Sequence, residues 1–126
     1  MNYKGVIIEE SLYNSHILNG VTILKTRQEK VTPKHKTPWL TQWTLHTIEI
    51  PKENMDVVAD TLSKSFETQH PAWYIDFKND TLHFIIFPNK VFKINLKNPV
   101  LYKSARQYGE SLGIPPYQMQ FERLKR

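Results

Sequence analysis

The stretch Trp73–Leu96, WYIDFKNDTLHFIIFPNKVFKINL, predicts three consecutive strands joined by two short turns. β-Branched and aromatic residues dominate it, and apolar residues alternate with polar ones at a period of two. Asn79-Asp80 is typical of the two central residues of a tight hairpin turn. Counting outward from such a turn places Asp76 directly opposite His83.

The second turn of this stretch determines which side chains share a face of the sheet. A three-residue loop at Pro88–Lys90 would pair Phe87 with Val91 and Phe84 with Ile94. One face is then wholly apolar and is predicted to be core: Trp73, Ile75, Phe77, Leu82, Phe84, Ile86, Phe92, Ile94 and Leu96. The other face is mixed and is expected to carry the function: Tyr74, Asp76, Lys78, Thr81, His83, Ile85, Phe87, Val91 and Lys93.

The whole chain predicts an α+β fold. Further strands are expected at 3–9, 21–31 and 43–50, and helices at 52–66 and 99–112. Asn98 is the expected N-cap of the second helix, and Gly113 is its expected C′ residue. This order of elements favours an antiparallel sheet with two main helices packed on one face, related to the ferredoxin-like two-layer sandwich.

Length and composition favour a single domain covering residues 1–126. Hydrophobic residues make up 40% of the 126 positions and aromatic residues 12%, which is enough for one core. The absence of cysteine excludes disulfides, thiol catalysis and thiolate metal sites. No apolar run reaches the roughly 18 residues of a membrane span, and MNYKGVIIEESLYNSH lacks the pattern of a signal peptide. A cytoplasmic location is therefore expected.

The formal net charge is +5, and the excess lies toward the end of the sequence. Five basic residues stand against two acidic ones from Leu101 to Arg126, and 117–126 is expected to be a basic, partly frayed tail. Specific nucleic-acid binders cluster lysine and arginine on one ordered face. Nucleic-acid binding is therefore expected to be weak at most, and no membrane contact is expected.

The predicted pair of Asp76 and His83 is the first candidate for chemistry. A carboxylate beside an imidazole can fix the tautomer of the ring and raise its basicity, as a general base requires. Tyr74 lies on the same face, and His46, if its strand is a neighbour, would complete a set of two histidines and one carboxylate. The alternative is a cross-strand ion pair of about 0.2–1 kcal/mol with no catalytic role.

The histidines do not predict a metal site. They are far apart in the sequence and lack the HxH or HExxH spacing of metal ligands, at His16, His35, His46, His70 and His83. Neither a metal nor a cofactor is therefore expected.

The loop Pro33–Trp39, PKHKTPW, is the second candidate for function, together with Trp43. Cationic and aromatic side chains stand side by side in it, as in sites for single-stranded nucleic acid or phosphorylated ligands. The expected ligand-binding residues are Lys34, His35, Lys36, Trp39 and Trp43. The alternative is that both tryptophans anchor the core.

Several segments resemble those of a family of small prokaryotic proteins of similar length that have no assigned activity. These segments are WTLHTIEI at 43–50, WYIDFKND at 73–80, FPNKVFKI at 87–94 and YGESLGIPPYQ at 108–118. The resemblance covers most of the chain and implies a compact single domain, but it implies no chemistry.

These observations favour a non-enzymatic binding or interaction module that uses the mixed face of the sheet. Ile85, Phe87 and Val91 make this face unusually apolar for open solvent, so we expect another surface to cover it. That surface could be the N-terminal segment of the chain itself, a ligand, or a second copy or other protein that contacts Tyr74, His83, Ile85 and Phe87. One alternative is a small enzyme that uses Asp76–His83 as general base. The other is a weak binder of nucleic acid or a phosphate ligand through Lys34, Lys36 and the basic tail.

Overall fold

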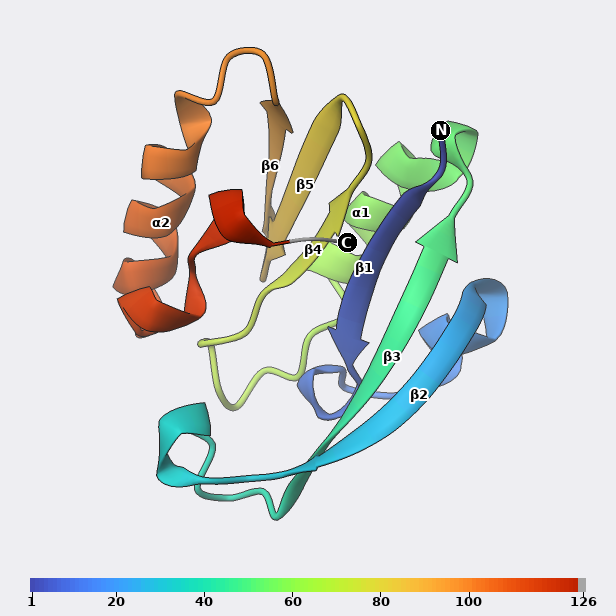
Figure 1. The fold of residues 1–126 in the computed structure, drawn as a ribbon. Coiled ribbons are helices and arrows are strands. Elements are labelled where there is room, and N and C mark those ends of the chain that lie inside the picture. The colour runs from blue at the N-terminus through green and yellow to red at the C-terminus, as the bar shows by residue number, and fades with distance from the viewer. Residues whose placement is uncertain (125–126) are drawn as a thin grey trace.

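A computed structural model describes residues 1–124 of the chain, and its centre is a six-stranded sheet (Figure 1). The strands are β1 (Tyr3–Ile8), β2 (Thr22–Lys30), β3 (Gln42–Ile50), β4 (Ile75–Lys78), β5 (Leu82–Phe87) and β6 (Lys90–Asn95). Their order is β2-β3-β1-β4-β5-β6, and every neighbouring pair is antiparallel. The α-helices are α1 (Met55–Ser63) and α2 (Leu101–Ser111). Short 3-10 turns lie at Glu9–Ser11, His16–Gly20, Pro33–His35, Lys52–Asn54, Pro116–Gln118 and Phe121–Arg123.

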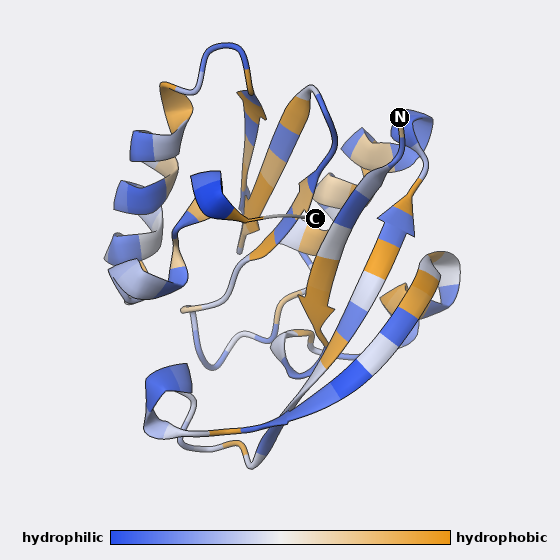
Figure 2. Cartoon of the chain, in the orientation of Figure 1, coloured by the Kyte–Doolittle hydropathy of each residue, from blue (hydrophilic) through white to orange (hydrophobic). Residues whose placement is uncertain are grey.

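The α+β class is confirmed, but the prediction that both helices pack on one face is wrong. Helix α1 packs over Phe84 and Ile86, whereas α2 packs over Ile85 and Phe87, which point to the opposite side of β5. The sequence of β5 explains the difference, because the strand is largely hydrophobic (Figure 2) and all side chains from His83 to Phe87 are buried. A strand buried on both faces needs cover on both faces. The ferredoxin-like relationship is not confirmed.

The first hairpin has a different register from the predicted one. Lys78 pairs with His83 and Asp76 pairs with Ile85, so four residues rather than two form the loop. The side chain of Asn79 builds this loop, because its Oδ1 accepts hydrogen bonds from the backbone N–H groups of Thr81 and Leu82, both at 2.9 Å. The shift leaves every side chain on its predicted face.

The second hairpin is shifted by one residue, which reverses the faces of β6. Phe87 pairs with Lys90 and Ile85 with Phe92, because the turn contains only Pro88 and Asn89. Asn89 adopts a φ of 60°, which allows this tighter turn. The prediction that Phe92, Ile94 and Leu96 share one face with Ile75, Phe77 and Phe84 is therefore wrong. They pack in the core beneath α2, and Val91, predicted for the mixed face, lies on the α1 side.

The C-terminal segment is packed rather than frayed as far as residue 124. Helix α2 begins at Leu101 with Val100 as its N-cap, so the prediction of Asn98 is wrong. The helix ends at Ser111, and Gly113 is the C′ residue as predicted, with a φ of 93°. The N–H of Ile114 donates to the carbonyl of Gly109, as in a Schellman motif. Met119 and Phe121 are fully buried, so the segment 114–121 forms part of the core. The last two residues of the predicted tail, 125–126, lie outside the described residues.

Candidate functional site

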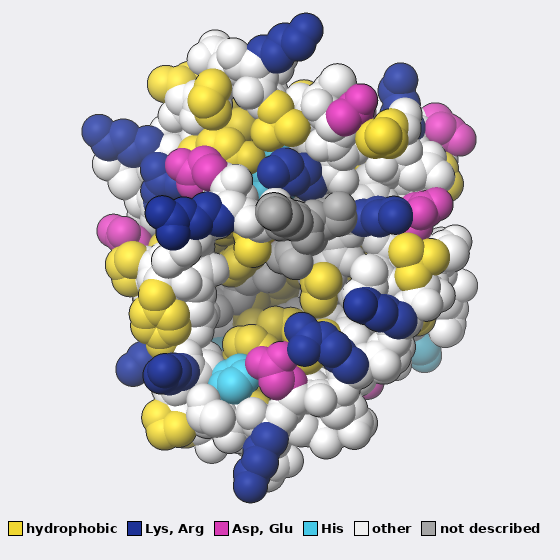
Figure 3. All heavy atoms as spheres, viewed as in Figure 1, with side chains coloured by type: hydrophobic (Ala, Val, Ile, Leu, Met, Phe, Trp, Pro, Cys, Tyr) yellow, Lys and Arg dark blue, Asp and Glu magenta, His cyan; other side chains and the backbone are white. Residues whose placement is uncertain are grey.

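The face of the sheet opposite α1 is covered over only half of its width. Helix α2 and the segment 114–121 cover β4, β5 and β6, while the part over β1, β2 and β3 remains hollow (Figures 1 and 3). The hollow is a cleft of about 350 Å³, within the usual range for small-molecule sites. Its lining comes from the sheet, the 33–39 loop, the segment 70–74 and the C-terminal segment: Val6, Ile8, Arg27, Glu29, Lys34, His35, Lys36, Thr37, Trp39, Trp43, Leu45, His70, Ala72, Trp73, Tyr74, Asp76, Pro115, Tyr117 and Gln118.

All three tryptophans of the chain line this cleft. Trp73 lies at the centre of the group, with the ring of Trp39 at 6.4 Å and nearly perpendicular, and the ring of Trp43 at 5.9 Å and tilted by 55°. Trp39 stacks on His70, with ring centroids 3.5 Å apart. Trp73 is buried and belongs to the core, whereas Trp39 keeps 43% of its surface exposed. One group of rings therefore continues from the core into a surface that a ligand can reach.

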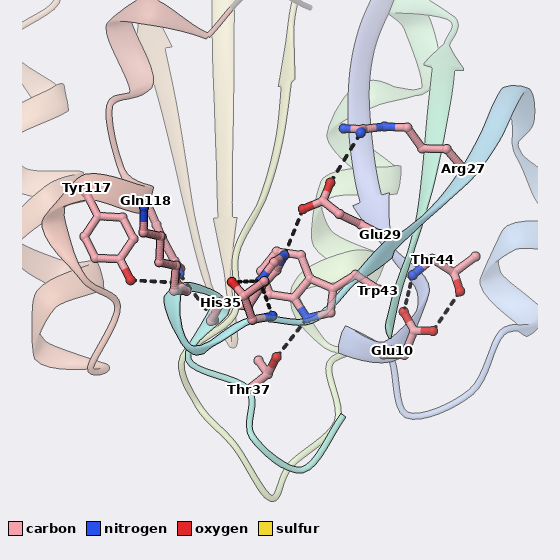
Figure 4. Close-up of polar contacts among 11 residues, drawn as sticks. Glu10, Arg27, Glu29, His35, Thr37, Trp43, Thr44, Tyr117 and Gln118 are labelled. Atoms are coloured by element: carbon pink, nitrogen blue, oxygen red, sulfur yellow. Dashed lines mark hydrogen bonds and ion pairs between the residues drawn. The ribbon is translucent and has the colours of Figure 1, made fainter. Parts of the chain in front are cut away.

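His35 fixes the conformation of the 33–39 loop (Figure 4). Its Nδ1 accepts the backbone N–H of Thr32 at 2.9 Å, so the proton of the neutral ring is on Nε2 and points to Glu29 Oε1 at 2.8 Å. The ring of His35 also meets the ring of Trp43 edge-on, at 4.3 Å. Trp43 in turn donates its Nε1–H to Thr37 Oγ1. The loop is thus attached to β2 and to β3 at the same time.

The C-terminal segment holds the other side of the same loop. Tyr117 donates its hydroxyl to the Lys34 carbonyl at 2.6 Å, and the Gln118 amide donates to that carbonyl at 3.1 Å (Figure 4). Tyr74, on the wall of the cleft, donates its hydroxyl to the Gln118 carbonyl at 2.6 Å. Hydrogen bonds within the chain therefore join opposite walls of the cleft.

Glu67 organises the third wall, which runs from residue 67 to Trp73. Its carboxylate accepts hydrogen bonds from the backbone N–H groups of Gln69 and His70, from the His70 ring at 2.6 Å and from the Trp73 indole at 3.0 Å. Burial acts to raise the pKa of Glu67, but the hydrogen bonds from Trp73 and His70 outweigh it and lower the pKa. The ionised carboxylate thus holds His70 in the position where Trp39 stacks on it.

The charged side chains of the cleft leave an excess of positive charge. Arg27 lies 3.3 Å from Glu29, which also accepts the hydrogen bond from His35. Lys34 and Lys36 are exposed and make no ion pair within residues 1–124. Figure 3 shows a hydrophobic floor in the hollow, with basic, acidic and histidine side chains at its lower rim. The geometry therefore suits a flat ligand that bears negative charge.

The predicted contact between Asp76 and His83 exists, although the two residues are not directly paired. His83 Nε2 lies 2.7 Å from Asp76 Oδ2, and His83 Nδ1 lies 2.6 Å from the hydroxyl of Tyr102 on α2. Donors and acceptors match when Nε2–H donates to the carboxylate and the Tyr102 hydroxyl donates to Nδ1. Burial, with smaller contributions from Glu122 and Asp76, raises the pKa of Tyr102 to about 12. Of these three residues, Asp76 alone lines the cleft.

His46 does not join this pair. It lies on the α1 face of β3, where its ring bonds Glu9 Oε1 at 2.8 Å and Thr26 Oγ1 at 2.7 Å. The sheet therefore separates His46 from His83, and the proposed set of two histidines and one carboxylate does not form. No group of three or more metal-ligating side chains occurs among the residues that the structure describes.

The mixed face of the central strands is covered by the chain itself, through α2 and the C-terminal segment rather than the N-terminal segment. His83, Ile85 and Phe87 are fully buried beneath α2 and the C-terminal segment, and Tyr74 is partly buried. The open part of this face is the cleft. Within residues 1–124, the helices are too short and too polar to cross a bilayer.

The five residues predicted from the 33–39 loop and Trp43 all line the cleft: Lys34, His35, Lys36, Trp39 and Trp43. Sequence pattern did not identify the residues of the other walls, chiefly His70, Trp73 and Tyr117. A signal for the first two exists, because His70-Pro71-Ala72-Trp73 repeats the combination of histidine, proline and tryptophan found in PKHKTPW. Tyr117 follows two prolines, in a segment that the charge pattern assigns to the tail.

Protein-family models, curated proteins and solved structures give no match to this chain. The evidence for function is therefore the geometry of the cleft.

Proposed function

We propose that this chain is a ligand-binding domain without catalytic activity, and that its cleft takes a flat, largely apolar ligand with a negatively charged group. The observation that carries the proposal is the convergence of all three tryptophans on one cleft of about 350 Å³. Ligand sites are typically concave, lined by aromatic side chains and furnished with a few polar groups that orient the ligand. The exposed Lys34 and Lys36 supply the charge.

Preorganisation supports the same proposal. The 33–39 loop is tied to β2 through His35, to β3 through Thr37 and to the C-terminal segment through the Lys34 carbonyl. A ligand that enters a cleft with fixed walls loses less free energy to the ordering of side chains. An aromatic group that served only the core would not need exposed rings, yet Trp39 is 43% exposed.

An enzyme that uses Asp76–His83 as general base has less support. Both ring nitrogens of His83 are hydrogen-bonded, and the ring is fully buried, so a substrate has no route to it. A general base must come within hydrogen-bond reach of the proton that it abstracts. We assign the pair to positioning the Asp76 carboxylate at the wall of the cleft.

The proposal is tested by titrating the protein with 8-anilinonaphthalene-1-sulfonate, a flat aromatic anion, and following tryptophan fluorescence. Because every tryptophan lines the cleft, a probe bound there quenches their fluorescence, and the two variants show whether the bound probe lies in the cleft. We expect saturable quenching by the native protein, and binding weakened at least tenfold, by about 1.4 kcal/mol, in Trp39→Ala. Tyr13→Ala is the matched control, since Tyr13 is an exposed aromatic residue outside the cleft.

Two results would contradict the proposal. One is the absence of saturable quenching by a protein that is folded by near-ultraviolet circular dichroism. The other is equal affinity in the native protein, Trp39→Ala and Tyr13→Ala, which would place the probe outside the cleft.

A further inference from the structure

We propose that the natural ligand of the cleft is a nucleobase that carries a phosphate, with the base against the tryptophans and the phosphate at Lys34 and Lys36. This inference rests on the proposed function of the cleft and specifies its ligand. Three observations carry it. The two lysines make no ion pair in residues 1–124, the other charged residues of the lining are already bonded to neighbours, and the aromatic rings are partly exposed.

Lys34 and Lys36 form a pair of cations on one fixed turn. They flank His35, whose hydrogen bonds to Thr32 and Glu29 hold the turn, and Lys36 has a φ of 61° at its end. Both lysines line the cleft, and both are exposed. Two ammonium groups beside one cleft suit an anion with more than one negative charge, such as a phosphate monoester, better than a single carboxylate.

The other charged residues of the cleft are already engaged. Glu29 is bonded to Arg27 and His35, and Asp76 is bonded to His83. An aromatic cage for a quaternary ammonium group would need a site without excess positive charge, but here two lysines stand beside the rings. The electrostatics therefore select an anionic ligand rather than a cationic one.

The aromatic rings select a planar group. Trp39 has one face on His70, yet 43% of its surface is exposed, and Trp43 is partly buried in the same wall. Nucleobases stack on such rings whatever their sequence, because each base has a π-face. Proteins that bind single-stranded nucleic acids combine positively charged side chains for the phosphates with aromatic rings on which the bases stack.

A base with a phosphate has two sources, a free nucleotide or a nucleotide within a single strand. Both present a base to the tryptophans and phosphate oxygens to the lysines. A free nucleotide supplies its charge through one phosphate monoester, whereas a strand supplies it through neighbouring diesters that carry one negative charge each. The cleft opens to the surface (Figure 3). The two sources differ in the number of phosphates that follow the base, so salt dependence separates them.

The experiment measures binding of the four ribonucleoside 5′-monophosphates, the matching nucleosides, inorganic phosphate and a 10-nucleotide single strand by tryptophan quenching. We expect at least one monophosphate to bind tenfold or more tightly than its nucleoside. In the double variant Lys34→Gln/Lys36→Gln, binding of that monophosphate should fall to the affinity of the nucleoside, which itself should not change. Lys25→Gln/Lys30→Gln is the control with equal charge change, since these lysines lie on β2 and do not line the cleft.

The inference is overturned if every monophosphate binds no better than its nucleoside, or if the two double variants lose affinity equally. If 8-anilinonaphthalene-1-sulfonate binds and none of the nucleotides does, this inference fails while the proposed function stands. If neither binds, both fail. Tighter binding of the single strand, with a steep loss as salt rises, supports the inference and identifies nucleic acid as the source. Equal affinity for strand and monophosphate supports it and identifies the free nucleotide.

Discussion

Trp39 and His70 stack with their rings nearly parallel, 3.5 Å apart and inclined by 4°, although they belong to loops far apart in the sequence. The stack joins the loop between β2 and β3 to the segment that leads into β4. Glu67 fixes the position of the His70 ring, because Glu67 Oε2 lies 2.6 Å from His70 Nδ1. The position of the most exposed tryptophan in the cleft therefore depends on a carboxylate that does not line the cleft.

Removal of the His70 ring should release Trp39. In His70→Ala we expect stronger quenching of tryptophan fluorescence by acrylamide and a loss of about 0.5–1.5 kcal/mol in the free energy of unfolding, the usual contribution of a ring pair. His16→Ala is the control, since His16 is exposed and does not line the cleft. Unchanged quenching in His70→Ala would mean that other contacts hold Trp39.

Ionised Glu67 should make the fold sensitive to acid. Its folded-state pKa lies below its unfolded value, so its stabilisation is fully present above the ordinary pKa of about 4.3 and is lost as pH falls through the lower folded-state pKa. At pH 7 we expect Glu67→Gln to lose about 1–3 kcal/mol, since four donors lose their charged acceptor. Urea unfolding from pH 3 to pH 7 should show this difference shrinking at acid pH. The exposed Glu110→Gln should show no such trend, and a difference for Glu67→Gln that is independent of pH would contradict the assignment.

The buried chain from Asp76 through His83 to Tyr102 should respond to loss of a single hydroxyl. Tyr102→Phe keeps the ring but leaves His83 Nδ1 without its donor in the core, which should cost about 1–3 kcal/mol in urea unfolding. Tyr108→Phe on the same helix is the control, because Tyr108 is only partly buried. Equal stability of the two variants would show that the hydrogen bond to His83 contributes nothing net.

Gly5 should tolerate no side chain. It pairs with Phe77 in the middle of the sheet, and a Cβ at this position would meet the Asp76 carbonyl oxygen and the Phe77 ring. We expect Gly5→Ala to lose about 1–3 kcal/mol of stability, and thermal unfolding measures it. Gly20→Ala is the matched control, since a Cβ added there would meet no atom of the described chain within 4 Å. A Gly5→Ala variant as stable as Gly20→Ala would contradict the packing described between β1 and β4.

The turn at Asn89 should accept glycine but not alanine. A φ of 60° costs an ordinary L-residue about 1–2 kcal/mol, whereas glycine adopts it freely. Asn89→Gly should therefore leave the midpoint of urea unfolding nearly unchanged or raised, while Asn89→Ala should lower it. The reverse order of the two variants would argue against the two-residue turn and the β6 register that depends on it.

Local pattern predicted most of the elements correctly, because alternation and helical periodicity depend on near neighbours. The two ends of α2 differ in how well the sequence predicts them. Gly113 was predicted correctly, because few residue types adopt its positive φ. Asn98 was not the N-cap, because many residue types can precede a helix. The registers of both hairpins were wrong because the loop length depends on hydrogen bonds of single side chains, such as those of Asn79. Because the turn at Asn89 is one residue shorter than predicted, Phe92 and Ile94 face the core beneath α2 and not the opposite face of the sheet.

Only part of the cleft lining could be predicted from the sequence, because sequence pattern relates only residues that are near one another in the chain. The cations and Trp39 of PKHKTPW could be identified together with the nearby Trp43, and the structure places them in one cleft. The other walls come from residues 70–74 and 115–118, which only tertiary packing brings to this loop. The mixed face of the central strands is predicted to be uncovered because both helices are predicted to lie on the opposite face. Its cover is α2 and the C-terminal segment, whose Met119 and Phe121 belong by sequence pattern to a tail but by packing to the core.

The central position of β1 has a consequence for the order of folding. The β2–β3 hairpin closes over residues 31–41, and the β4–β5–β6 meander closes over shorter loops. In contrast, β1 pairs with distant residues on both sides, as in Ile8 with Leu45 and Lys4 with Lys78. Long loops cost entropy before their contacts form, so such pairings are slow to nucleate. We expect two local units to form early and to be joined in the rate-limiting step by the strand between them. The first strand of the chain is then the last to be placed.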